Sequence, residues 1–352
     1  MIQNDNKKAQ VSALIAMSGG VDSTVAAFLS VDEGLKCSGA VMRVFDNSDK
    51  TVRDAETAAN ELGIPFHEFD FTDEFKKIVI SDFINAYNEG RTPNPCVTCN
   101  KNLKFGLFLD KALALGNDCI ISGHYALTER DTNGRYLLKK GVDLSKDQSY
   151  VLYTLSQAQL SRLRFPLGNL TKAKVREIAT KAGIINANKS DSQDICFIPD
   201  GDYKKFIFGY TGKSPKPGRF IDIDGNDLGE CKGISSYTVG QRRGLGLSMP
   251  HPPYVISINP QNNTVVIGKE DMLYSNSLEA KDINFIPFDT LKSPIKAMVK
   301  IRYADPGHLA TVEQTSDNIV QVEFDKPQRA ITKGQAAVFY DGDIVIGGGT
   351  IM

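Results

Sequence analysis

The first two hundred residues alternate short apolar runs with stretches of helical periodicity. The apolar runs predict strands at 11–17, 38–45, 65–70 and 118–122. The helical pattern predicts helices at 22–33, 50–62, 72–88, 100–115 and 171–182. Alternation of strand and helix is typical of a parallel sheet covered by helices. We therefore expect an α/β domain in the N-terminal part of the chain.

The pattern changes after Tyr203–Tyr210. Prolines and glycines now punctuate short β-like runs, among them Pro215, Pro217 and Gly218. Further apolar runs predict strands at 254–258, 264–267, 295–303, 319–324 and 336–340. Short strands separated by turns indicate a β-barrel-like tail.

Composition limits the class of protein. The chain has 352 residues, of which 41% are hydrophobic and 24% charged, as in ordinary globular proteins. No apolar run approaches the ~20 residues that span a bilayer, and the polar stretch Met1–Gln10 has no signal-peptide character. We expect a cytoplasmic protein without a membrane partner. Its six cysteines are then more typical of thiols, ligands or catalysts than of structural disulfides.

The net charge of −1 by itself argues against nucleic-acid binding, but the charge is unevenly distributed. No acid lies between Asp147 and Glu177 or between Asp289 and Asp305, and both intervals are rich in lysine and arginine. Arg242 and Arg243 form a basic loop flanked by glycines. Any one of these patches could be a solvated face. Three of them favour a surface for a phosphate backbone, with Arg242, Arg243, Lys300 and Arg302 as contacts.

A glycine turn joins the first predicted strand to the first predicted helix. Residues 18–23 read Ser-Gly-Gly-Val-Asp-Ser. Such a turn directs backbone N–H groups and the positive end of a helix dipole at one point, which favours phosphate binding. Two other phosphate motifs are excluded: Gly212-Lys213-Ser214 lacks the earlier Walker glycine because position 207 is isoleucine, and no Gly-x-Gly-x-x-Gly follows a strand.

This turn resembles the PP-loop of ATP pyrophosphatases. Enzymes with that loop cleave ATP between the α and β phosphates and transfer AMP to an oxygen of the substrate. The resemblance implies ATP as a substrate, with Mg²⁺. It does not choose among thiolases, amidotransferases and ligases.

A second motif contains two cysteines, Cys96 and Cys99, in the run Thr92-Pro-Asn-Pro-Cys-Val-Thr-Cys-Asn-Lys101. We expect a rigid loop that ends at a helix beginning near Asn100, so that the helix dipole would stabilise the Cys99 thiolate. A zinc site would need a second ligand pair. A thioredoxin-like redox pair usually lacks flanking Asn-Pro, so a catalytic cysteine on a rigid loop fits best. Cys196 lies in a polar run, residues 190–199, and is a candidate partner of Cys99.

These motifs occur in an order that resembles the bacterial tRNA-specific 2-thiouridylase family over nearly the whole chain. The other shared motifs are Gly123-His-Tyr125, Lys146-Asp-Gln-Ser149, Ile195-Cys-Phe-Ile198, Tyr237–Leu245 and Lys300-Ile-Arg-Tyr303. The resemblance implies thiolation of the wobble uridine in glutamate, glutamine and lysine tRNAs. It also implies a PP-loop domain at 1–202, a small central domain at 203–272 and a C-terminal β-barrel at 273–352.

The resemblance also implies roles for single residues. Cys99 would be the nucleophile and Cys196 would carry a persulfide. The target base would be surrounded by Asn94, Pro95 and Cys96. ATP would be bound by Ala16, Met17, Ser18, Gly19, Gly20, Val21, Asp22, Ser23, Met42 and Gly123. The anticodon stem-loop of tRNA would be contacted by His124, Lys146, Asp147, Gln148, Arg302, Tyr303 and Gln335. A cysteine desulfurase or a sulfur-relay protein would load the persulfide.

Cys96 departs from the family pattern, in which many members have an aspartate that is proposed to transfer a proton. A thiol does not replace a carboxylate of pKa near 4. Cys96 could be a spectator, or Cys96, Cys99 and Cys196 could ligate an iron–sulfur cluster with one open iron. The alternative functions are a PP-loop ligase acting on a small molecule and a tRNA-binding protein without catalysis.

Overall fold

The computed structural model describes residues 10–45, 49–184 and 195–352. The chain divides into two compact units. The first comprises the described parts of Met1–Lys76, Thr98–Ser192 and Asp343–Val345, and the second those of Lys77–Val97, Gln193–Gly342 and Ile346–Met352. Each unit is therefore built from separate stretches of the chain.

A five-stranded parallel sheet forms the centre of the first unit. Its strands are β1 (Ser12–Ala16), β2 (Lys36–Arg43), β3 (Phe66–Asp70), β4 (Cys119–Ser122) and β7 (Leu163–Arg164), in the order β3-β2-β1-β4-β7. All neighbouring strands in it are parallel. The predicted α/β class is confirmed. The four predicted strands are present, and β7 was not predicted.

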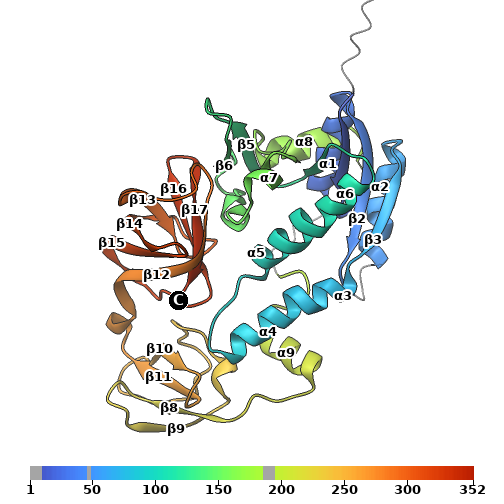
Figure 1. The fold of residues 1–352 in the computed structure, drawn as a ribbon. Helices are drawn as coiled ribbons and strands as arrows, with labels where there is room; N and C mark the ends of the chain where they lie inside the picture. Colours follow the sequence, from blue (N-terminus) through green and yellow to red (C-terminus); the bar gives the residue numbers. More distant parts are fainter. Residues whose placement is uncertain (1–9, 46–48, 185–194) are drawn as a thin grey trace, which may run out of the picture. The chain divides into compact units, whose positions relative to one another are not determined.

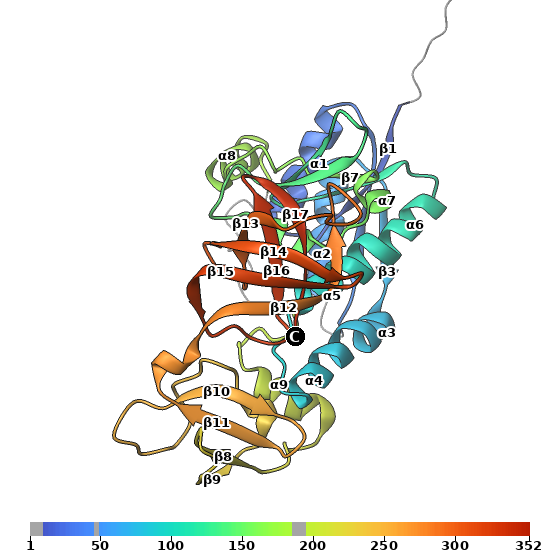
Figure 2. The same ribbon diagram turned by 60° about the vertical axis from the view of Figure 1, so that its left-hand side comes forward.

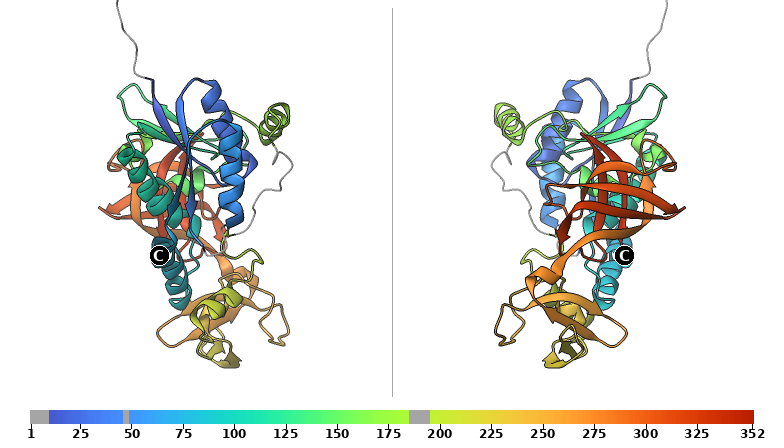
Figure 3. Two further views of the ribbon diagram at one scale, coloured as in Figure 1. Left: turned by 90° about the vertical axis from the view of Figure 1, so that its right-hand side faces the viewer. Right: turned by 90° about the vertical axis from the view of Figure 1, so that its left-hand side faces the viewer.

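Helices lie on both sides of this sheet (Figure 3, left). Helices α1 (Val21–Asp32), α2 (Asp49–Glu61) and α8 (Lys172–Lys181) share one hydrophobic cluster with β1, β2 and β4, centred on residues such as Val25, Ala55 and Val175. Helix α6 (Phe108–Ala114) contacts β4 outside that cluster. The first unit also contains the hairpin β5 (Ala126–Arg130) and β6 (Tyr136–Lys140), the 3₁₀ turn η3 (Ser149–Leu152) and helix α7 (Gln157–Leu160), none of which was predicted.

The two longest predicted helices are interrupted by π-helical turns. The first consists of α3 (Thr72–Phe75), η1 (Lys76–Ile80) and α4 (Ser81–Asn88). The second consists of α5 (Pro95–Cys99), η2 (Asn100–Leu107) and α6. The predicted start near Asn100 is wrong, because the helix begins at Pro95. Proline suits a first helical position, and the Asn94 side chain accepts a hydrogen bond from the Cys96 amide at 3.1 Å.

The second unit contains a small sheet and a barrel (Figures 1 and 2). Helix α9 (Tyr203–Thr211) precedes a four-stranded sheet of order β10-β11-β8-β9. Its strands are β8 (Gly218–Ile221), β9 (Asp227–Cys231), β10 (Tyr254–Asn259) and β11 (Thr264–Gly268), and η4 (Ile234–Ser236) adds a turn. The predicted strands at 254–258 and 264–267 therefore belong to this sheet and not to the barrel.

Six antiparallel strands form the barrel, which is the predicted C-terminal architecture. They are β12 (Tyr274–Phe285), β13 (Ile295–Lys300), β14 (His308–Ser316), β15 (Ile319–Arg329), β16 (Ala336–Asp341) and β17 (Ile344–Ile351), preceded by the turn η5 (Glu270–Leu273). Their order is β12-β15-β14-β13-β16-β17, and β17 pairs with β12 to close the barrel. Buried and exposed positions alternate from Val320 to Asp325 in β15, as expected where one face of a strand fills a barrel.

Within the described parts of the chain, no helix is both long and apolar enough to cross a membrane.

The closure of the barrel generates a prediction about Gly347. This glycine pairs with Phe285 on β12, and a Cβ atom added to it would overlap the carbonyl oxygen of Asn284. Gly347→Ala should destabilise the protein by about 1–3 kcal/mol, because backbone must move to admit the methyl group. Urea unfolding followed by circular dichroism measures this difference. An unchanged urea midpoint would show that the pairing of β12 with β17 accommodates the methyl group with no loss of stability.

Candidate active site

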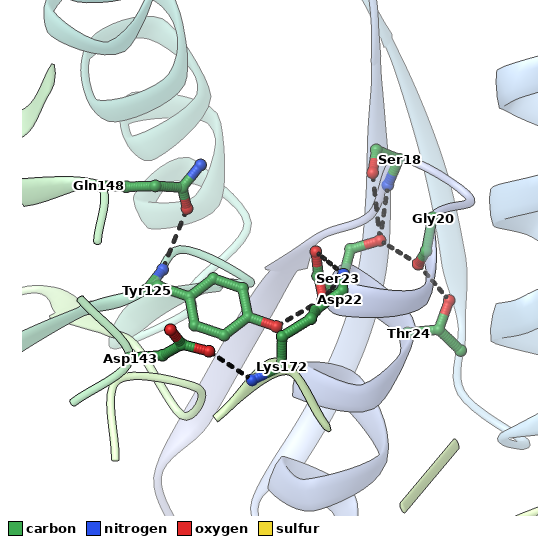
Figure 4. Close-up of polar contacts among 9 residues, drawn as sticks. All are labelled: Ser18, Gly20, Asp22, Ser23, Thr24, Tyr125, Asp143, Gln148 and Lys172. Carbon is green, nitrogen blue, oxygen red and sulfur yellow. Dashed lines mark hydrogen bonds and ion pairs between the residues drawn. The ribbon is translucent and has the colours of Figure 1, made fainter. Parts of the chain in front are cut away.

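The glycine turn lies where the carboxyl end of β1 meets the first turn of α1 (Figure 4). Gly19 has a φ of +63°, a conformation that favours glycine, and a side chain there would clash with Asp54 on α2. Gly123 follows β4, and a Cβ added to it would lie 2.8 Å from the backbone carbon of Asp22. The structure thus brings Gly123 against residues 18–23. All of these residues were expected to bind ATP, and that role stays a prediction.

The serine hydroxyls of the turn are used within the turn itself. Ser23 Oγ donates to the Gly20 carbonyl at 3.0 Å and accepts from the Ser18 amide at 3.1 Å. Thr24 Oγ1 donates to the same carbonyl at 3.0 Å. Ser23 therefore shapes the loop, while no side chain caps the first turn of α1. Backbone amides at an uncapped helix start are suited to an anion.

The carboxylate of Asp22 contacts two residues that the sequence did not single out for this site. Tyr125 Oη donates to Asp22 Oδ1 at 2.8 Å. Lys172 Nζ donates to Oδ1 at 2.7 Å and to Oδ2 at 2.8 Å. The Lys172 side chain is only 10% exposed. Figure 4 shows Tyr125 and Lys172 lying on one side of the loop. The contact with Asp22 places the largely buried Lys172 ammonium beside the first turn of α1.

A second layer of polar contacts holds these two residues. The amide of Lys172 donates to Asp143 Oδ2 at 2.9 Å, and this contact lowers the pKa of the Asp143 carboxyl. The amide of Tyr125 donates to Gln148 Oε1 at 3.0 Å, and the Gln148 amide donates to the Tyr125 carbonyl at 2.9 Å. Gln148 was predicted to contact tRNA; here its side-chain oxygen positions the backbone of Tyr125.

Two other predicted tRNA contacts are buried. Asp147 accepts hydrogen bonds from the Gly141 and Ser149 amides at 3.1 Å, whereas Lys146 is half-buried. His124 is 8% exposed, hydrogen-bonded to Ser122 and packed against two phenylalanine rings. Burial holds its pKa well below the usual value, so the imidazole is neutral. Contacts of these residues with tRNA stay a prediction.

Cys96 and Cys99 both lie on α5. Cys96 is exposed in the first helical turn, and Cys99 is half-buried at the end of the helix. The argument from the helix N-terminus therefore applies to Cys96 and not to Cys99. The following residue, Asn100, is buried and donates from its side chain to the Val151 carbonyl at 3.2 Å. Asn100 and Val151 both belong to the first unit.

Cys196 is exposed and belongs to the second unit, while Cys99 belongs to the first. Its neighbour Phe197 is buried, with its ring 5.4 Å from that of Phe83 on α4 and 5.0 Å from that of Phe206 on α9. The polar run at 190–194 lies outside the described residues. In the described ranges, no group of three or more His, Cys, Asp or Glu side chains could hold a metal ion. The catalytic pairing and the cluster both stay predictions.

The remaining predicted residues differ in their burial. Met42 is half-buried on β2. Arg242 and Arg243 are exposed, and Arg242 with residues 244–253 lines a cavity of about 540 Å³. Arg302 and Tyr303 are exposed between β13 and β14. Gln335 is half-buried, and its Nε2 donates to the Thr92 carbonyl at 3.0 Å.

Three family models match successive parts of the chain. They are described as a tRNA methyl transferase HUP domain at residues 11–200, a tRNA methyl transferase PRC-barrel domain at 204–269 and an aminomethyltransferase beta-barrel domain at 275–351. The first alone covers more than half of the chain.

Close relatives match the chain from end to end. The chain is 48% identical to the tRNA-specific 2-thiouridylase MnmA of Acetivibrio thermocellus and 47% identical to MnmA 1 of Clostridium botulinum, over 96% of this chain and 98% of each relative. It is 46% identical to MnmA of Clostridioides difficile over 98% of both proteins. Similarity of this extent, together with the phosphate loop, shows that the chain belongs to the tRNA-specific 2-thiouridylase family.

Proposed function

We propose that this protein is an ATP-dependent sulfurtransferase that forms 2-thiouridine at the wobble position of glutamate, glutamine and lysine tRNAs. The observation that supports it most directly is the glycine turn with its buried Lys172, in a chain whose relatives are named tRNA-specific 2-thiouridylases. The expected domain boundaries at 202/203 and 272/273 and the cytoplasmic location belong to the same proposal.

Activation of the uridine begins at the glycine turn. The C2 carbonyl of uridine is a poor electrophile and must first be activated. Its O2 attacks the α-phosphorus of ATP, and the bond between the α-phosphorus and the bridging oxygen of the β-phosphate breaks. The products are an O-adenylated uridine and pyrophosphate, and AMP becomes the leaving group at C2. The amides of residues 18–23 and the first turn of α1 hold the phosphates.

Lys172 is proposed to neutralise charge on the phosphates. Its ammonium lies 2.7 Å from Asp22 Oδ1, in the first turn of α1, directly after the glycines of the turn. Mg²⁺ bound with ATP would further neutralise the departing pyrophosphate. Both carboxylate oxygens of Asp22 accept hydrogen bonds from Lys172. Mg²⁺ would therefore be held by the phosphates of ATP and not by Asp22.

Sulfur transfer is assigned to Cys196 and Cys99. A donor protein loads Cys196 as a persulfide, and the terminal sulfur attacks C2 of the adenylated uridine. Cys99 then attacks the inner sulfur, the S–S bond of the persulfide breaks, and AMP leaves. The products are 2-thiouridine and a Cys99–Cys196 disulfide. A dithiol reductant must restore the two thiols before the next turnover.

The target uridine is assigned to Asn94, Pro95 and Cys96. The base must leave the anticodon stack to reach these residues, as in other enzymes that modify bases. An iron–sulfur cluster on Cys96, Cys99 and Cys196 is the alternative mechanism. A PP-loop ligase acting on a small molecule is the alternative function, and it would not need the cysteines.

The first prediction concerns ATP activation. The protein should release pyrophosphate only when tRNA is present, and Lys172→Gln should lower this rate about a hundredfold, because one positioned cation is lost. Lys174→Gln is the matched control, since Lys174 lies on the same helix but is exposed and paired with Glu177. Pyrophosphate release without tRNA would favour a PP-loop ligase acting on a small molecule. Equal rates for Lys172→Gln and Lys174→Gln would refute the role of Lys172.

The second prediction concerns tRNA capture. Alanine substitutions at Arg242, Arg243, Lys300 and Arg302 should each reduce the slope of log K against log salt by ~1, because one phosphate contact is lost. Lys205→Gln is the control, as Lys205 is exposed and paired with Asp200. Filter binding at several salt concentrations gives the slopes. A quadruple variant with the slope of wild type would mean that these patches are only solvated faces.

The third prediction concerns the cysteines. Cys196→Ser should lose persulfide loading, whereas Cys99→Ser should load sulfur without forming 2-thiouridine. Cys37→Ser is the control, because burial raises the pKa of Cys37 and makes it a poor nucleophile. Mass spectrometry of the protein and of tRNA nucleosides measures both steps. The deciding variant is Cys96→Ser. Near-normal activity of Cys96→Ser, with no iron in wild type prepared anaerobically, supports the persulfide route. Activity that requires iron and the thiols of Cys96, Cys99 and Cys196 supports the cluster.

A further inference from the structure

A loop of the β-barrel holds the segment that leads into α5. Thr92 N donates to the Lys333 carbonyl at 2.8 Å, and Gln335 Nε2 donates to the Thr92 carbonyl at 3.0 Å. Both polar groups of the Thr92 backbone are therefore bound by one barrel loop. All of these residues belong to the second unit, and the segment runs between α4 and α5 in Figure 1.

A side chain at Gly334 would press on residues 91–92. A Cβ atom there would lie 3.0 Å from Arg91 Cβ and 3.1 Å from both the nitrogen and the oxygen of Thr92. Gly334 also has a φ of +91°, which favours glycine. A Cβ atom on this part of the barrel would thus require residues 91–92 to shift by a few tenths of an ångström.

The barrel loop is itself fixed to strand β17. The Gly334 amide donates to the Ile351 carbonyl at 2.9 Å, and the Ile351 amide donates to the Gln335 carbonyl at 2.8 Å. Thr332 Oγ1 donates to the Ala330 carbonyl at 2.8 Å. The loop is therefore a rigid support and not a mobile partner for Thr92.

Little freedom remains between Thr92 and the predicted base contacts. Only Pro93 separates Thr92 from Asn94, and its ring fixes one backbone angle. Asn94 then accepts from the Cys96 amide through its side chain and from the Val97 amide through its carbonyl, both at 3.1 Å. A displacement of Thr92 is consequently passed on to Asn94 and Cys96.

We propose that the barrel loop Thr332–Gln335 clamps the segment Thr92–Cys96, and that Gln335 is a positioning residue for thiolation. The proposal rests on the proposed function, which assigns the target uridine to Asn94, Pro95 and Cys96. Gln335 was expected to contact tRNA directly. In the clamp its amide acts on the protein backbone, and its effect on the reaction passes through Thr92.

Two glycine variants separate the clamp from ordinary strain in the barrel. Gly334→Ala and Gly342→Ala both place a methyl group on a left-handed residue, with φ values of +91° and +56°. Only at Gly334 does the methyl group press on residues 91–92, since a Cβ at Gly342 meets no atom within 4 Å. Gln335→Met adds a variant of similar length that lacks the donor.

Hydrogen–deuterium exchange of the free protein tests the mechanical part. Exchange of the peptide covering 89–97 should rise in Gly334→Ala and Gln335→Met and stay unchanged in Gly342→Ala. Exchange in β13 and β15 should stay slow in all three variants, which shows that the barrel is folded. Unchanged exchange at 89–97 in both clamp variants would overturn the proposal, whether or not the protein thiolates tRNA.

Kinetics test the functional part, with wild type required to form 2-thiouridine. Gly334→Ala and Gln335→Met should lower kcat roughly tenfold or more at unchanged tRNA affinity, because a misplaced segment costs rate and not binding. Gly342→Ala should keep the wild-type kcat. Weaker tRNA binding at unchanged kcat in Gln335→Met would assign Gln335 to direct tRNA contact and refute its positioning role. Failure of wild type would refute the proposed function and leave the exchange result to judge the clamp.

Discussion

The ion pair between Asp22 and Lys172 is the interaction on which the candidate ATP site depends. It joins the first turn of α1 to the first turn of α8, and its ammonium is largely removed from water. An ammonium in such a place requires a partner, and Asp22 supplies it with both oxygens. A pair of this kind contributes little net stability, because desolvation offsets much of the attraction. We therefore propose that this pair, which lies beside the glycine turn, serves phosphate binding and not stability.

The segments that carry the proposed chemistry share one structural principle. Each is short and polar, and each is fixed by rigid neighbours. Ser23 and Thr24 shape the glycine turn through the Gly20 carbonyl. The ring of Phe197, the residue that follows Cys196, packs among aromatic rings, and the barrel loop holds Thr92. Reactive groups on loops that a scaffold holds in place are the usual arrangement in enzymes.

Strands were predictable where an apolar run in the sequence corresponds to a buried strand in the structure. Strands β1 and β4 are apolar runs because they are central in a parallel sheet with covered faces. Strands β12 and β14 were missed because half of their residues face solvent and are polar, so no apolar run marks them. The start of the helix that carries Cys99 was predicted five residues too late, because the proline pattern of residues 92–95 suggested an extended loop throughout. In the structure Pro95 begins the helix.

The sequence by itself was enough to identify motifs that consist of consecutive residues. Residues 18–23 form the glycine turn from β1 into α1, and a candidate phosphate loop of this kind is local, since its glycines and its helix start are adjacent in the chain. Only the tertiary structure selected Lys172 from the other lysines near it, because its distinction is a contact with Asp22. It likewise brought Gln335 to Thr92, 243 positions away. Contacts of this kind arise from the packing of whole elements, and no local pattern of residues records them.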